Sequence, residues 1–190
     1  CSGTLMYGNT GSIADEEQPL SPIAYARAYE YAERPFTEEA KGTILDVRTA
    51  RPAWILGSDS WFEYFFYRPA LASGFVPYYG DGRQQMSIIS VEDCAGQLLH
   101  VSTHGSKGES YNLFGFAPIS QLEFAEKIGD VLGLDVRQVD EKELVKKHGK
   151  TVAEALTSNT PVTTMHSEWK DSYKAVDRNL DLLIAKTVKV

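Results

Sequence analysis

Apolar and polar residues alternate along the chain in blocks that are typical of an α/β protein. Short apolar runs bounded by turn residues predict buried strands at residues 43–47, 49–56, 75–79, 86–91, 109–114 and 136–139. Longer stretches with helical spacing predict helices at residues 23–40, 58–74, 92–103, 120–132, 141–148 and 151–156. Because strands and helices alternate, the sequence favours a mostly parallel sheet covered by helices.

The segments outside this alternation are short or polar. Residues 1–8 are predicted to be the end of a buried strand. Pro35 is expected to end the first part of the first helix near Arg34, because proline removes a backbone donor and clashes with the preceding turn. The remaining segments are predicted as loops at residues 9–21 and 158–164 and as partly helical at residues 169–190.

The composition is that of an ordinary globular protein and disfavours a nucleic-acid partner. Of the 190 residues, 43% are hydrophobic and 24% are charged, with a net charge of −7. A nucleic-acid groove normally shows a stripe of Lys and Arg, whereas the basic residues here are scattered.

Cysteine usage and hydropathy exclude further classes of protein. Cys1 and Cys94 are the only cysteines, so the sequence offers neither a disulfide framework nor a Cys-x-x-Cys metal site. No apolar run reaches the roughly 18 residues of a membrane helix, and no basic-then-apolar signal pattern opens the chain. A cytoplasmic location is therefore expected, and the absence of an initial Met suggests a processed, truncated or partially recorded polypeptide.

Four short motifs, in order within residues 1–135, carry the candidate chemistry. They are Ser2-Gly3-Thr4-Leu5-Met6-Tyr7-Gly8, Tyr25-x-x-x-Tyr29 with a later Glu33, Arg51-Pro52-Ala53-Trp54-Ile55-Leu56-Gly57, and Gly80-Asp81-Gly82 followed by Val91-Glu92-Asp93-Cys94-Ala95. In this order and spacing they resemble the extended short-chain dehydrogenase/reductase family, which includes the sugar-nucleotide epimerases and dehydratases. The family's Gly-rich dinucleotide loop does not occur in the sequence.

The resemblance implies a fold and a division of the chain. The fold would be the later part of a Rossmann-like parallel sheet plus a small carboxy-terminal α/β substrate domain. Residues 1–60 would form the partial Rossmann-like segment, and residues 61–190 would be mainly substrate-binding, with returning sheet strands.

The resemblance also assigns candidate roles. Tyr25 stands where the family's catalytic tyrosine exchanges a proton with the substrate, and Ser2 and Thr4 flank the position of the hydroxyl that orients it. The cofactor would be NAD or NADP, which supplies the hydride chemistry. The candidate cofactor-binding residues are Tyr25, Pro52, Ala53 and Ile55, and the candidate substrate-binding residues are Tyr7, Trp61 and Arg83.

Several positions depart from the family pattern. Tyr29 replaces the lysine whose ammonium favours the phenolate, and Gly3 stands at the usual Ser/Thr position. Arg27 cannot take over the lysine's role, because on an ideal helix it lies roughly 160° away from Tyr29. Met86 replaces an arginine that grips a phosphate in the sugar-nucleotide enzymes, which speaks against a nucleotide-sugar substrate.

Other chemistry-bearing residues have simpler interpretations. Asp93 is expected to start a helix rather than to act in catalysis. Most of the dense aromatic residues between 54 and 79 are expected in the core, with some lining an apolar pocket. His100 and His104 have metal-ligand spacing but no third ligand in view, so no metal site is predicted.

The sequence supports three hypotheses about function. The first is an NAD(P)-dependent epimerase, dehydratase or reductase acting on a small polar or sugar-like substrate. The second is a non-catalytic cofactor-sensing or RNA-associated protein of the same fold, like the chloroplast stem-loop-binding proteins that the chain also resembles. The third is a free-standing domain that forms a homodimer through an open sheet edge.

Overall fold

Parallel strand pairs form the centre of the molecule in a computed structural model that describes residues 1–39 and 42–188. The parallel pairs are β1 (Thr49–Pro52) with β6 (Ser110–Leu113), β2 (Trp54–Leu56) with β5 (Ile88–Ser90), and β3 (Phe75–Tyr79) with β8 (Asp135–Val139). One antiparallel pair joins β4 (Gln85–Met86) to β7 (Ile119–Ser120). The predicted α/β fold with a Rossmann-like parallel sheet is confirmed.

Residues 49–56 run as one extended segment that changes partner at Ala53. The Ala53 backbone N–H donates to the Leu113 carbonyl at 2.8 Å, whereas the next N–H, that of Trp54, donates to the Ser87 carbonyl at 3.1 Å. The candidate site lies beside this β1–β2 junction.

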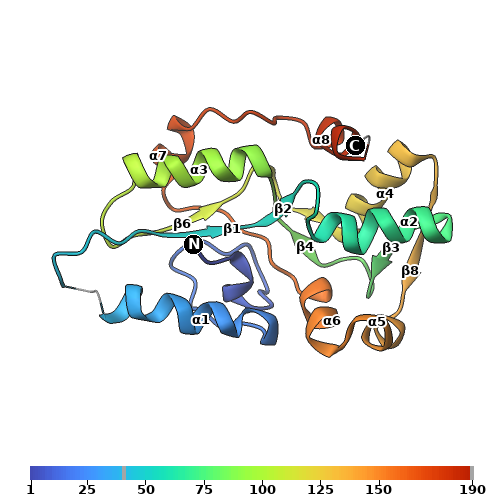
Figure 1. The fold of residues 1–190 in the computed structure, drawn as a ribbon, viewed down its shortest axis with the longest axis horizontal. Coiled ribbons are helices and arrows are strands. Elements are labelled where there is room, and N and C mark those ends of the chain that lie inside the picture. Colours follow the sequence, from blue (N-terminus) through green and yellow to red (C-terminus); the bar gives the residue numbers. More distant parts are fainter. Residues whose placement is uncertain (40–41, 189–190) are drawn as a thin grey trace.

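Helices cover both faces of the β1–β6 pair, with α1 on one side and α3 on the other (Figure 1). The α-helices are α1 (Arg27–Arg34), α2 (Arg68–Ser73), α3 (Val91–His104), α4 (Gln121–Leu132), α5 (Glu141–His148), α6 (Lys150–Thr157), α7 (Ser167–Ser172) and α8 (Leu180–Thr187). Shorter 3₁₀ turns lie at Thr4–Tyr7 and Ala24–Ala26, and π-helical turns lie at Pro35–Glu39 and Glu63–Tyr67. Among the described residues, no helix combines the length and the apolar character that crossing a membrane requires.

The predicted helix at residues 120–132 and the predicted effect of Pro35 are both confirmed. α4 starts at a capping box, in which Ser120 and Glu123 satisfy each other's backbone donors, and ends at the left-handed Gly133. α1 ends at Arg34 as Pro35 predicts, although a π-helical turn continues the coil. The predicted end of this helix at Ala40 lies outside the described residues, as do the last two residues of the carboxy-terminal segment.

Three local predictions are wrong. Residues 1–8 contain a 3₁₀ turn rather than a strand end; the N–H of Ser2 still donates to the Ala50 carbonyl at 2.8 Å. Residues 43–47 form no strand, and most of this run lies in solvent, with Ile44 97% exposed. Residues 158–164 are not merely a loop, since Thr160 and Val162 form bridges to Met86 and Ala14.

Asp93 fixes the carboxy-terminal part of the chain to α3. Ser90 caps the helix by accepting from the Asp93 N–H, and the buried Asp93 carboxylate accepts from the Tyr173 hydroxyl and from the backbone N–H groups of Val176 and Asp177. Burial opposes ionisation of this carboxyl, but the donated hydrogen bonds outweigh it and lower the pKa of Asp93. Its helix-start position agrees with the prediction, and the structure adds its role as an anchor.

Two large apolar cores hold these layers together. One joins residues of β1, β5, β6 and α3 to Tyr7, Ala14, Val162 and Trp169, and the other packs α2, α4, α6 and α8 around the aromatic residues Phe62, Phe66 and Phe124. The first core therefore contains residues from both sides of residue 60, where the sequence predicts the boundary between the two segments. The boundary stays a prediction.

Candidate active site

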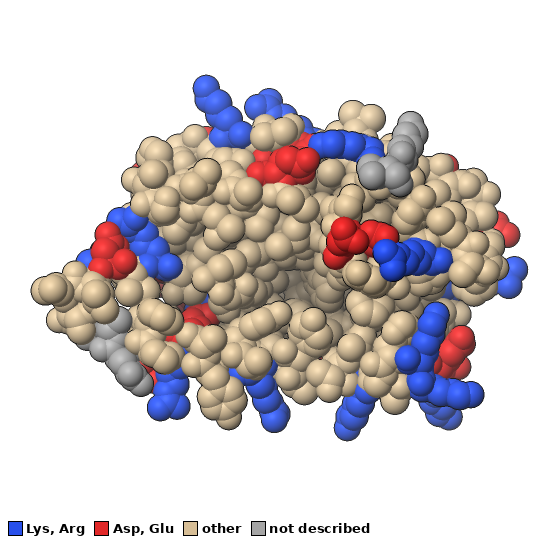
Figure 2. Space-filling model, in the orientation of Figure 1, with Lys and Arg blue, Asp and Glu red and all other residues tan. Residues whose placement is uncertain are grey.

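A cavity of about 570 Å³ opens beside the β1–β2 junction. Its lining comes from the amino-terminal turn, the start of the tyrosine helix (the turn Ala24–Ala26 followed by α1), the β1–β2 junction, the segment before and within the π-helical turn at Glu63–Tyr67, the start of α3, and α6. Figure 2 shows a hollow in the middle of this face that is bordered mostly by uncharged residues, with acidic side chains and a neighbouring basic one on its upper right, while most Lys and Arg side chains lie towards the edges. The lining residues are Cys1, Ser2, Gly3, Thr4, Leu5, Tyr25, Tyr29, Pro52, Ala53, Trp54, Ile55, Ser58, Ser60, Trp61, Phe65, Val91, Val152, Ala155 and Leu156.

Most of the site residues predicted from the sequence meet at this cavity. The candidate proton donor Tyr25 and the flanking hydroxyl residues Ser2 and Thr4 line it, although they come from separate elements. So do the predicted cofactor-binding residues Pro52, Ala53 and Ile55 and the predicted substrate-binding residue Trp61. The structure thus brings together residues that span positions 2 to 61 of the sequence.

The two departures from the family pattern are neighbours in space. A Cβ atom built on Gly3 would lie 3.9 Å from Cε2 of Tyr29 and 3.9 Å from the Pro52 carbonyl oxygen, which is ordinary contact. Gly3 has an extended backbone, with φ −166° and ψ 159°, which any residue can adopt. Serine therefore fits at position 3, and the missing hydroxyl does not reflect lack of room.

Tyr25 and Tyr29 form an edge-to-face pair with ring centroids 6.5 Å apart. Both rings remain partly open, with 46% of Tyr25 and 39% of Tyr29 exposed. Burial, assisted by repulsion from Tyr25, raises the pKa of Tyr29, so Tyr29 stays neutral around pH 7. A neutral ring thus occupies the place of the family's positive charge.

Aromatic residues and α6 form the opposite wall. Trp54 and Trp61 pack edge to face with centroids 4.8 Å apart. α6 contributes Val152, Ala155 and Leu156, and the Glu154 carboxylate accepts a hydrogen bond of 3.2 Å from the Ala24 N–H at the start of the tyrosine helix. This contact fixes α6 beside Tyr25.

The α6 wall was not assigned to the site from the sequence. Its apolar residues occur at helical spacing within the predicted helix 151–156, which marks a buried face. Nothing in that local pattern indicates which face of the molecule the helix covers.

Tyr7 and Arg83 do not line the cavity. Tyr7 is 2% exposed; its hydroxyl donates to Asn112 Oδ1 at 2.8 Å and accepts from Arg51 Nη1 at 3.2 Å. Burial raises the pKa of Tyr7 despite these contacts. The Arg83 side chain is 89% exposed and lies 4.0 Å from Asp81.

A buried ion pair supports the site from behind. Arg51 Nη2 donates to Glu33 Oε1 at 2.5 Å, and each side chain is 6% exposed. Burial acts to lower the pKa of Arg51, but Tyr7 and Glu33 outweigh it and raise the pKa. The pair joins α1 to β1 and thereby sets the position of the tyrosine helix against the strand.

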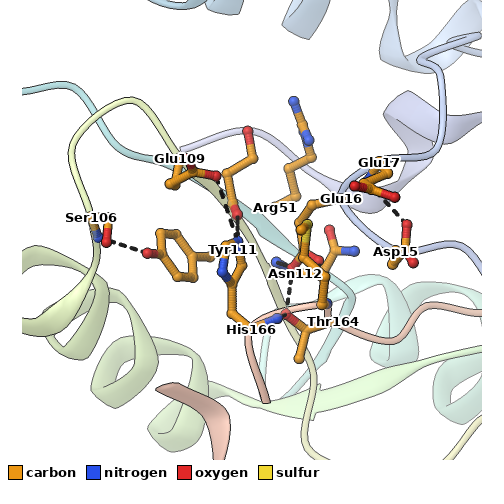
Figure 3. Close-up of polar contacts among 12 residues, drawn as sticks. Asp15, Glu16, Glu17, Arg51, Ser106, Glu109, Tyr111, Asn112, Thr164 and His166 are labelled. Carbon is orange, nitrogen blue, oxygen red and sulfur yellow. Dashed lines mark hydrogen bonds and ion pairs between the residues drawn. The ribbon is translucent and has the colours of Figure 1, made fainter. Parts of the chain in front are cut away.

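Glu16 and Asn112, which the sequence did not single out, tie the polar loop of residues 9–21 to the sheet (Figure 3). The Glu16 carboxylate accepts from the Asn112 N–H at 2.6 Å, the Thr164 hydroxyl at 2.7 Å and the Met165 N–H at 2.8 Å. The Asn112 side chain connects this cluster to Tyr7. These contacts hold the segment that joins the amino-terminal turn to the tyrosine helix.

The cavity fits the nicotinamide end of a dinucleotide. Its volume lies within the usual range for ligand pockets of roughly 300–1,000 Å³, and its wall is uncharged. The Ser2 hydroxyl is buried at this wall without a hydrogen-bond partner in the part of the chain that the structure describes, so a polar group of a bound ligand could pair with it. The pyrophosphate end requires a glycine-rich turn, and no G-x-G-x-x-G sequence occurs in the chain.

Metal-binding groups are not assembled around the cavity. Among the described residues, no group of three or more His, Cys, Asp and Glu side chains is placed to hold a metal ion. His100 and His104 lie on α3 with ring centroids 4.3 Å apart, and His100 Nε2 contacts the Ser172 hydroxyl at 2.8 Å.

Solved structures share this fold, whereas sequence comparisons find no relative. No family model and no curated protein sequence matches the chain. dTDP-glucose 4,6-dehydratase from Bacillus anthracis, solved with NAD, is 22% identical, with a TM-score of 0.77 over 99% of this chain and 59% of that one. Human epimerase family protein SDR39U1, solved with NADPH, is 16% identical, with a TM-score of 0.77 over 99% of this chain and 63% of that one.

A third structure gives the same result. UDP-N-acetylglucosamine 4-epimerase from Methanobrevibacter ruminantium, in complex with UDP-N-acetylmuramic acid, is 20% identical, with a TM-score of 0.74 over 99% of this chain and 60% of that one. The chain therefore spans about three fifths of the length of these structures. At these identities the likeness establishes the fold, which is that of NAD-dependent epimerases and dehydratases. It does not establish the activity of any of these proteins for this chain.

Proposed function

We propose that the protein takes part in NAD(P)-linked epimerase, dehydratase or reductase chemistry on a small compound with a hydroxyl or carbonyl group. The observation that carries the proposal is the meeting of Tyr25, Ser2, Thr4 and the Pro52–Ile55 segment at one cavity of about 570 Å³. The sugar-like compounds expected from the sequence are one class of such substrates.

The residues of this chain can perform the proton chemistry. The Tyr25 side chain at the cavity is 46% exposed, and its hydroxyl is a suitable donor to a carbonyl oxygen or acceptor from an alcohol. Ser2 and Thr4 line the same cavity and are the residues that we expect to orient the same oxygen. A bound nicotinamide would supply or accept the hydride, with Pro52, Ala53 and Ile55 as the residues beside its ring.

The neutral Tyr29 limits this chemistry. In the family that the sequence resembles, an ammonium at this position stabilises the tyrosinate, and the chain supplies a neutral phenol instead. We therefore expect slow turnover compared with enzymes that keep the lysine. The cofactor-sensing alternative shares the cavity but needs no turnover.

Titration of the purified protein with NADH and NADPH, followed by nucleotide fluorescence, tests the proposal. Saturable binding of one nucleotide, together with cofactor-dependent turnover that Tyr25→Phe abolishes, is the expected result. Ser21→Ala, a change at an exposed residue outside the cavity lining, serves as the matched control that loses a side-chain hydroxyl. Binding without turnover in any tested carbonyl or alcohol would favour the cofactor sensor; no binding of either nucleotide would refute both.

A further inference from the structure

The charge distribution around the cavity points to a particular class of substrate. No lining residue carries a charged side chain among those that the structure describes. On the elements that form the cavity, Arg51 pairs with Glu33, Arg34 with Glu38, and Arg68 with Glu63. Arg27 and Lys150 lie on the same elements but are exposed and outside the lining. Recognition of a phosphate or carboxylate normally uses a free Arg or Lys, and the cavity wall offers none.

The helix starts near the cavity also disfavour anions. A helix amino terminus ordinarily attracts negative charge through its free N–H groups and dipole. α3 starts at the lining residue Val91, but its first turn already contains the carboxylates of Glu92 and Asp93, and Ser90 caps the Asp93 N–H. At the tyrosine helix, the Ala24 N–H is occupied by the Glu154 carboxylate. A bound anion would meet negative charge at both places.

The rest of the wall is suited to an apolar body. The lining includes Trp54, Trp61, Phe65, Val152 and Leu156, so a ring inside the cavity would contact aromatic and aliphatic side chains. The polar side-chain groups of the lining are uncharged: hydroxyls, the indole N–H groups of Trp54 and Trp61, and the Cys1 thiol. The Ser60 hydroxyl among them already donates to the Gly57 carbonyl at 2.7 Å. One oxygen on the ligand can pair with hydroxyl groups of the lining such as those of Tyr25 and Ser2.

From these observations we infer that the substrate is an uncharged carbonyl compound or alcohol with an apolar, ring-bearing body, and not a nucleotide sugar. The inference rests on the proposed function for the identity of the cavity as the substrate site. It concerns binding by this chain's own residues and does not require bound cofactor.

Calorimetric titration without cofactor tests the inference with matched ligands. Acetophenone and 1-phenylethanol represent the uncharged class, 4-carboxyacetophenone adds one negative charge to the same ring, and UDP-glucose represents nucleotide sugars. We expect the uncharged ligands to bind at least tenfold more tightly than either charged ligand, with quenching of the tryptophan emission. Equal or tighter binding of 4-carboxyacetophenone or UDP-glucose would overturn the inference.

Charge-introducing variants give a second test. Val152→Lys places a cation in the wall and should reverse the preference, so that 4-carboxyacetophenone binds more tightly than acetophenone. Thr151→Lys, on the exposed side of the same helix, should keep the wild-type preference. If Val152→Lys does not fold, the ligand comparison on the wild-type protein decides the matter.

The outcomes separate this inference from the proposed function. Binding of acetophenone by a protein that binds neither NADH nor NADPH would refute the proposed function and leave the apolar site standing. If a nicotinamide nucleotide binds but neither acetophenone nor 1-phenylethanol binds at concentrations up to its solubility limit, the inference alone is refuted.

Discussion

Removal of the Glu33 charge should destabilise the protein strongly, because Glu33 is the buried counter-ion of Arg51. Nη2 of Arg51 lies 2.5 Å from Oε1 of Glu33, and both side chains are 6% exposed. Loss of one partner leaves the other charge in a low-dielectric interior, which typically costs about 3–5 kcal/mol. Since the amide of Glu33→Gln can still accept a hydrogen bond, we expect about 3 kcal/mol for this variant.

A double-mutant cycle isolates the ion pair. Glu33→Gln, Arg51→Met and the double variant are compared with the wild type by urea unfolding at pH 7. Because the second change removes the charge that the first leaves unpaired, the double variant should be more stable than the sum of the single losses predicts, by about 2 kcal/mol. Glu38→Gln breaks the exposed Arg34–Glu38 pair, with side chains 62% and 68% exposed, and should cost no more than about 0.5 kcal/mol.

Two results would contradict the reasoning. If the two single losses add within about 0.5 kcal/mol, Glu33 and Arg51 do not act as a pair. If Glu33→Gln is no more harmful than Glu38→Gln, the pair is not buried in solution, and the tyrosine helix is not held against β1 in the way described.

Three further predictions follow from other contacts. Gly3→Ser combined with Tyr29→Lys should raise cofactor-dependent turnover at least tenfold over the wild type, because serine fits at position 3 and the new ammonium stabilises the tyrosinate of Tyr25. An unchanged rate in a folded variant would show that another group limits catalysis. Asp93→Asn should lower the free energy of unfolding by roughly 3 kcal/mol at pH 7. Because the pKa of Asp93 is lowered in the folded state, this loss should shrink as the pH falls below about 4. A difference in urea midpoints that stays constant with pH would refute the anchor role. Burial lowers the pKa of Lys170 to about 8, below the ordinary value of about 10.4. Between these values the unfolded chain keeps a proton on Lys170 that the folded chain has released. The free energy of unfolding should therefore rise between about pH 7.5 and pH 9.5. Lys170→Met should remove most of that rise in chemical-denaturation midpoints, and an equal rise in the variant would contradict the assignment.

Local patterns predicted much of the fold because they act over a few residues. The capping pair Ser120 and Glu123 and the terminal Gly133 fix α4 through backbone hydrogen bonds within one helix. The strand prediction at residues 43–47 failed because strand formation depends on packing against neighbouring strands, whereas Ile44 is 97% exposed.

The candidate site was predictable only in part. The motif order brought out Tyr25, Ser2 and Pro52, which the structure places on one cavity. The α6 wall and the Glu154 contact depend on how a helix more than 120 residues further along packs against the tyrosine helix, with Ala24 and Glu154 separated by 130 positions. Tertiary packing of that kind leaves no local signal in the sequence.

Tryptophan mapping of nucleotide binding tests the central claim most directly. Trp54 and Trp61 line the cavity, whereas Trp169 is 7% exposed in the core beside α3. Energy transfer from tryptophan to bound NADH or NADPH should therefore fall sharply in the Trp54→Phe/Trp61→Phe variant and persist in Trp169→Phe. Transfer that survives in the first variant and disappears in the second would contradict the assignment of this cavity as the cofactor and substrate site.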